Sequence, residues 1–170
     1  MKKLLLFLAF TGLITFTSCE GDQGPPGVDG RESEVYELRN VDFTLDNNGE
    51  YSIYETLNPQ ILLSDNILIY RMSGTIDSQT PVWQLIPRTL FLDGIGELDY
   101  DYDFSREDFK IYAGGTYNLA TTPEFINNQT FRIVIIPGYL SNRGGVPIDY
   151  NDYNAVIKAY DIDDSNVTQL

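Results

Sequence analysis

A strict two-residue alternation runs through Glu97-Leu98-Asp99-Tyr100-Asp101-Tyr102-Asp103-Phe104. Successive side chains of a β-strand point to opposite faces of a sheet, so this pattern predicts a half-buried strand with its apolar side chains inward. A second strand pattern, Thr89–Leu92, precedes it, and Asp93-Gly94-Ile95-Gly96 between them carries the glycines of a tight turn. The stretch therefore predicts a β-hairpin over residues 89–104.

Similar short patterns recur along the rest of the chain. Apolar, aromatic and β-branched residues cluster in six further segments, at 35–45, 51–57, 67–72, 82–86, 108–112 and 131–136. The segment 131–136 is the most apolar, which predicts a central strand. Pro87 follows the segment 82–86 and has no backbone N–H, so we expect that strand to end or kink there.

The first two of these segments predict another hairpin, because Asp46-Asn47-Asn48-Gly49 between them favours a turn. Only residues 152–160 favour a helix. Ala155, Val156 and Ala159 would form its apolar face, and Asn151 or Asp149 would cap its N-terminus.

The order of these elements predicts the fold class. There are about seven to eight short strands and one short C-terminal helix, without the strand–helix alternation of a parallel sheet. We therefore expect an all-β fold, an antiparallel β-sandwich, formed by residues 33–170 as one domain.

The composition excludes several kinds of chemistry. The chain has one cysteine and no histidine, so it has no intrachain disulfide, no Cys–His or Ser–His–Asp machinery of its own, and no ordinary zinc site. No phosphate loop, dinucleotide fingerprint or nucleophile elbow is present. We expect no enzyme activity; a carboxylate-based hydrolase is a remote alternative, because 25 acidic residues make some carboxylate pair inevitable.

Residues 1–18 are predicted to be a removable export signal. Lys2 and Lys3 precede an apolar run, Leu4–Phe16. As a helix this run would span about 20 Å, which is shorter than the roughly 30 Å hydrocarbon core of a bilayer. The pattern is typical of a signal peptide rather than of a permanent transmembrane helix.

Cys19 follows this run directly, with the small residues Thr17 and Ser18 before it. The sequence resembles the lipobox of bacterial lipoproteins, with Phe16 where leucine is usual. The resemblance implies cleavage before Cys19, a diacylglyceryl group on its thiol and an acyl chain, such as palmitate, on the new N-terminus. Several acyl chains anchor a protein stably where one chain is marginal. The alternative is an ordinary signal with an incidental cysteine.

Residues 19–32 form the predicted tether. Gly21, Gly24, Gly27 and Gly30 recur at every third position, with Pro25 and Pro26 filling one triplet, which is a collagen-like Gly-X-Y pattern. Three triplets are too few to hold a triple helix. We expect residues 21–30 of this tether to be an extended spacer, which at about 3.1 Å per residue would lift the domain roughly 30 Å from the membrane.

This layout resembles the small collagen-like-repeat lipoproteins of Gram-negative bacteria. The resemblance rests on the lipobox cysteine, the acidic Glu20 and Asp22, the triplets and the β-rich remainder, with further similarity at 131–137 and 149–156. It implies a lipid-anchored protein of the outer membrane, and the acidic residues after the cysteine resemble signals for surface export. A periplasm-facing anchor remains the alternative. The resemblance implies no activity.

Two groups of residues are candidate binding sites. Asp99, Asp101 and Asp103 would lie on one strand face about 6 to 7 Å apart, where a cation such as Ca²⁺ would relieve their repulsion. The alternatives are a solvated outer face and an edge that resists strand pairing. Trp83, with some of the 12 tyrosines, would form an aromatic platform for sugars or peptides, or would pack in the core.

The net charge of −14 disfavours some classes of binding partner. Loss of the two lysines in the signal leaves −16, which repels nucleic acid and anionic lipid headgroups. We expect no nucleic-acid partner and no cofactor besides the covalent lipid. The hypothesis is a non-catalytic binding or interaction module for a glycan or a partner protein; the alternative is a structural lipoprotein of the cell envelope without a soluble ligand.

Overall fold

The computed structural model describes residues 32–140, 147–165 and 167–170. The predictions on the signal peptide, Cys19 and most of the tether lie outside these ranges. The strands of the described part are β1 (Glu34–Val41), β2 (Thr44–Leu45), β3 (Tyr51–Thr56), β4 (Asn66–Asp77), β5 (Thr80–Ile86), β6 (Arg88–Leu92), β7 (Gly96–Phe104), β8 (Asp108–Gly115), β9 (Gln129–Ile136) and β10 (Thr168–Gln169). Its helices are α2 (Tyr153–Ala159) and the short 3₁₀ turns Leu119–Thr121, Pro123–Phe125 and Gly138–Leu140.

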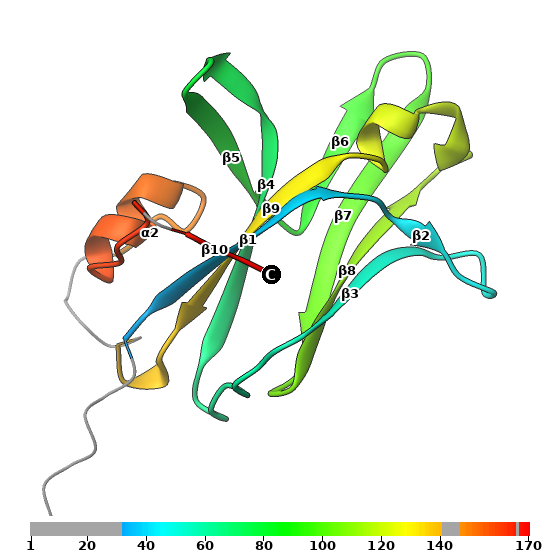
Figure 1. The fold of residues 1–170 in the computed structure, drawn as a ribbon. Helices are drawn as coiled ribbons and strands as arrows, with labels where there is room; N and C mark the ends of the chain where they lie inside the picture. The colour runs from blue at the N-terminus through cyan, green and yellow to red at the C-terminus, as the bar shows by residue number, and fades with distance from the viewer. Residues whose placement is uncertain (1–31, 141–146, 166) are drawn as a thin grey trace, which may run out of the picture.

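The strands form two five-stranded sheets. The first sheet has the order β10-β1-β9-β4-β5 and the second β2-β3-β8-β7-β6. The neighbouring strands pair antiparallel, except β1 and β10, which pair parallel over two residues. Figure 1 shows the two sheets side by side and α2 beside the first. The prediction of an all-β sandwich with one short C-terminal helix is confirmed.

The segment 35–45 is not one strand, contrary to expectation. β1 pairs with β9 in the first sheet, whereas β2 pairs with β3 in the second. The chain crosses between the sheets at Phe43, which is buried and donates its backbone N–H to the carbonyl of Ile126 at 2.8 Å. Only the last two residues of the segment therefore form the expected hairpin with β3.

Pro87 marks a second crossing. β5 ends at Ile86 in the first sheet and β6 begins at Arg88 in the second, which confirms that the strand ends at the proline. The hairpin over residues 89–104 is also confirmed, as β6 and β7. Gly94 in its turn has φ +70°, a conformation that glycine adopts without strain.

The main core lies between the sheets. β9 is the central strand of the first sheet and is buried on both faces, as predicted from its apolar sequence. Phe131, Ile133 and Ile135 face the second sheet, while Val134 and Ile136 face the side of α2. The first sheet is therefore the middle layer of the molecule.

α2 covers this second face with a different set of side chains. Val156 is fully buried, as expected, and Tyr153 and Tyr160 complete the buried face in place of the two alanines. The N-cap is Asp152, whose carboxylate accepts the N–H of Ala155 at 3.2 Å, and not Asn151 or Asp149. The cap is Asp152 because the helix begins at Tyr153, one residue after the predicted start at residue 152.

The helix covers only part of the outer face of the first sheet. Figure 1 shows the β4–β5 hairpin extending beyond α2. The uncovered part of this face, beside the start of α2, holds the candidate site. Among the described helices, none has the length and the apolar run needed to cross a bilayer.

Candidate functional site

Trp83 lies at the border between the covered and uncovered parts of this face. It belongs to the edge strand β5, opposite Met72 of β4, and is half-buried. The guanidinium carbon of Arg132 lies 4.6 Å from the centroid of the Trp83 ring, and the Tyr153 ring lies 5.8 Å from it. The predicted platform residue is therefore held in a fixed aromatic cluster.

Arg132 joins three elements at this point. Its Nε donates to Oε2 of Glu37 at 2.9 Å, and its Nη1 donates to the Tyr153 hydroxyl at 2.5 Å and to Oδ2 of Asp164 at 2.9 Å. The side chain is only 14% exposed. A guanidinium held by two carboxylates and one hydroxyl has a fixed orientation, so the Trp83 ring has a rigid neighbour.

Sequence analysis missed Arg132 because it lies within the most apolar segment of the chain. Its position could have been noticed, because a single arginine within a run of buried apolar residues must be paired with acidic or polar side chains. Its partners come from β1, from α2 and from the segment after α2, and no local pattern identifies them.

The contacts around Arg132 change the pKa values of Glu37 and Tyr153. Burial raises the pKa of Glu37, but the hydrogen bonds and charges of Arg132 and Arg39 outweigh it, so the net pKa lies below the ordinary value of 4.5. Burial also raises the pKa of Tyr153 far above the physiological range, with the charge of Arg132 acting against this. Glu37 is therefore ionised and Tyr153 neutral at neutral pH.

Two hollows adjoin the cluster and share Gln79, Pro81, Trp83 and Arg132 in their walls. The larger has a volume of about 600 Å³ and lies between the β4–β5 hairpin and the start of α2, where its remaining lining residues are Ile76, Thr80, Val82, Asn151, Asp152, Tyr153, Asn154 and Asp164. The smaller has about 320 Å³ and is completed by Glu37, Arg39, Asn40, Met72, Thr75, Ser78 and Thr130. We call this pair of hollows the Trp83 site.

The Trp83 site combines an aromatic ring with many hydrogen-bonding groups. Side-chain amides, hydroxyls, carboxylates and guanidinium groups surround the indole. Such a mixture suits a ligand with both apolar C–H faces and hydroxyl groups, because one part stacks and the other forms hydrogen bonds.

Asp99, Asp101 and Asp103 lie elsewhere, on the exposed outer face of β7. Leu98 and Tyr100 are buried on the opposite face as expected, whereas Phe104 at the end of the strand is 40% exposed. The Thr89 hydroxyl donates to Asp99 at 2.5 Å and the Tyr112 hydroxyl to Asp103 at 2.5 Å. In the part of the chain that the structure describes, no three histidine, cysteine, aspartate or glutamate side chains gather closely enough to hold a metal ion. The cation-binding role of the row stays a prediction.

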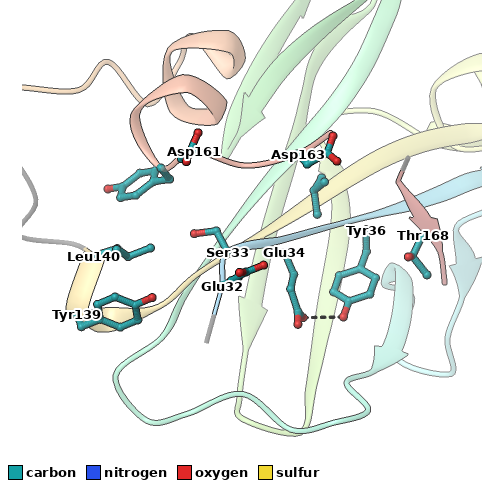
Figure 2. A pocket seen from close by; sticks show the side chains of 11 residues that line it. Glu32, Ser33, Glu34, Tyr36, Tyr139, Leu140, Asp161, Asp163 and Thr168 are labelled. Atoms are coloured by element: carbon teal, nitrogen blue, oxygen red, sulfur yellow. Dashed lines mark hydrogen bonds between the residues drawn. The ribbon is translucent and has the colours of Figure 1, made fainter. Parts of the chain in front are cut away.

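A third hollow of about 510 Å³ lies where the predicted tether meets β1. Figure 2 shows Glu32 and Glu34 where the chain enters β1, with Asp161 and Asp163 on the segment after α2 at the other side of the hollow. The Tyr36 hydroxyl donates to Glu34 at 2.7 Å, and the lining residues that the structure describes include no lysine or arginine. This hollow has the opposite charge character to the smaller hollow of the Trp83 site.

Comparisons with protein-family models, with curated proteins and with solved structures found no match to this chain.

Proposed function

We propose that this protein is a surface lipoprotein, anchored in the outer membrane through Cys19, that binds a glycan at the Trp83 site without catalysing a reaction on it. The observation that carries the proposal is the half-buried indole of Trp83 beside two adjoining hollows lined with polar side chains. The export signal, the lipobox cysteine and the spacer support the location.

The rigidity of the cluster supports binding over a purely structural role. Arg132 is fixed by Glu37, Asp164 and Tyr153 before any ligand arrives. A ligand that stacks on the indole then orders few protein side chains, which lowers the entropic cost of binding.

The test is calorimetric titration of the mature lipidated chain, in detergent, with a panel of bacterial and host glycans. We expect Trp83→Ala to weaken binding about tenfold or more, because stacking on an aromatic ring supplies much of the affinity in such sites. Trp83→Phe should retain part of the binding. Phe91→Ala removes an exposed aromatic ring from the second sheet and should change nothing. Equal affinities of wild type and Trp83→Ala would refute the site.

The anchor has its own test. Metabolic palmitate labelling should mark the wild type and not Cys19→Ala, and protease added to intact cells should remove the domain. Labelled protein that resists the protease would favour the structural envelope alternative. Wild-type protein without label would refute the anchor itself.

A further inference from the structure

We infer that the glycan is acidic, and that Arg39 binds the carboxylate of a uronic-acid-type sugar in the smaller hollow of the Trp83 site. This inference rests on the proposed function and specifies its ligand class. Arg39 and Trp83 both line that hollow, so one sugar residue can meet the indole and the guanidinium together.

An irregularity in β1 places Arg39 there. Leu38 pairs with Phe131 and Val41 with Gln129, so Arg39 and Asn40 together stand opposite a single residue of β9. This is a β-bulge, a feature that redirects side chains at the edges of binding sites.

Asn40, the second residue of the bulge, has a positive φ of 55°. Asparagine adopts this left-handed conformation more readily than most residues, so it suits the second position of the bulge. The bulge and this turn of the backbone occur together where Arg39 and Asn40 line the smaller hollow.

Arg39 has unused donor capacity. Its Nε donates to Glu37, and within residues 32–140, 147–165 and 167–170 its two terminal amino groups have no partner. The side chain is 58% exposed. Arg132, by contrast, uses both its Nε and Nη1 within the protein. The planar fork of Arg39 is therefore available for two parallel hydrogen bonds to a carboxylate.

The charge of the smaller hollow favours an anion. Its lining contains two arginines and one glutamate, a net charge of +1, in a chain whose formal net charge is −14. Among the described residues, the hollow in Figure 2 is lined by four acidic side chains, which would repel the same ligand. Arg132 is already paired with Glu37 and Asp164, so the attraction for an anion comes from Arg39, whose two terminal amino groups remain available.

The surroundings of Arg39 favour a sugar acid over a nucleic acid. Thr75, Ser78 and Thr130 supply hydroxyl groups in the same hollow. A pyranose with one carboxylate has hydroxyls for these groups, a C–H face for the indole and an anionic group for the guanidinium.

The experiment compares matched probes on the mature chain. Oligomers of galacturonate, glucuronate and mannuronate are titrated beside their methyl esters, which keep the sugar and remove the charge. We expect the acid form of at least one oligomer to bind about tenfold tighter than its ester, as one charge-assisted bidentate contact provides. Arg39→Gln should equalise the two forms, whereas Trp83→Ala should weaken both.

Arg88→Gln is the matched control, because Arg88 is also exposed but lies on β6 of the second sheet. It should leave the preference for the acid form intact. Binding of neutral glycans or of the esters without any preference for the acid forms would overturn this inference and leave the proposed function standing. Failure of every neutral and acidic glycan to bind would overturn the proposed function and the inference with it.

Discussion

The two outer faces of the sandwich carry similar residues in different surroundings. On the second sheet, Lys110 forms an ion pair with Glu50 at 3.0 Å, with the two side chains 26% and 48% exposed. On the first sheet, Arg132 forms its pair with Glu37 at 2.9 Å, and these side chains are 14% and 6% exposed. The difference arises because the second face is open to solvent, whereas α2 and the β4–β5 hairpin enclose the first.

The tyrosines of the two faces differ in the same way. Tyr54 and Tyr112 lie on the open face and donate to Asp108 and Asp103. Tyr70 lies beneath α2, where burial raises its pKa far above the physiological range, and donates to the backbone of Tyr150. Polar groups thus become structurally important where water is excluded, because their hydrogen bonds have no replacement there.

The largest expected effect separates the two ion pairs. Arg132→Ala leaves the buried Glu37 with only the exposed Arg39 as a charged partner, which should lower the free energy of unfolding by about 3 kcal/mol, the low end for a broken buried pair. Lys110→Ala on the open face should lower it by about 0 to 1 kcal/mol. Urea unfolding of both variants measures the contrast. Similar losses for the two would show that the enclosed face is not distinct from the open one.

The second effect is a pH dependence that belongs to Glu37. Its folded pKa lies below its ordinary value, so its contribution to stability is complete above about pH 4.5 and is lost as the pH falls through the folded pKa. Glu37→Gln should cost about 1 to 3 kcal/mol at neutral pH, because Arg132 loses a buried charged partner. The measurement is urea unfolding of wild type and variant from pH 7 to pH 3.

The difference between wild type and Glu37→Gln should shrink steadily across that acidic range. A difference that stays constant would mean that packing, and not the ionised carboxylate, accounts for the loss.

The third effect compares one hydroxyl on each face. Tyr70→Phe removes a 2.7 Å hydrogen bond to the carbonyl of Tyr150 and should cost about 1 kcal/mol. Tyr54→Phe removes a bond to Asp108 from a side chain that is 57% exposed, and should cost less than about 0.5 kcal/mol. Thermal unfolding of the two variants tests the order. A larger loss at Tyr54 would contradict it.

Local patterns predicted the open face well. The alternation of residues 97–104 is a property of one strand, so it placed the aspartates outward and Leu98 and Tyr100 inward before any tertiary contact was known. The β6–β7 turn is likewise determined by the residues within it. Where secondary structure alone decides the orientation of a side chain, the sequence was sufficient.

The enclosed face was not predictable in the same way. Arg132 and Glu37 are 95 positions apart, and their contact depends on the pairing of β1 with β9. The same pairing explains why the segment 35–45 divides between the sheets. Trp83 was identified from its residue type alone, whereas Arg39 and the bulge beside it required the register of two distant strands.

The smallest expected effect concerns Asp101, the middle residue of the aspartate row. Asp101→Asn should change the free energy of unfolding by less than about 0.5 kcal/mol, because the side chain is exposed and its removal relieves repulsion from its neighbours. Ca²⁺ binding requires about six or more oxygen atoms around one point, whereas neighbouring carboxylates on a strand face are about 6 to 7 Å apart.

The interpretation of the row as a sheet edge is wrong, because β7 lies between β8 and β6. The same variant decides between the two that remain, a cation site and a solvated outer face. We expect millimolar Ca²⁺ to leave the Tm of wild type and Asp101→Asn unchanged, because Asp99 and Asp103 are engaged by Thr89 and Tyr112 instead of converging on Asp101. A ligand that binds the folded state alone stabilises it by RT ln(1 + [L]/Kd), and therefore raises the Tm. A rise with Ca²⁺ that disappears in Asp101→Asn would establish the cation site, and the open face would then bind a ligand as the enclosed face is proposed to do.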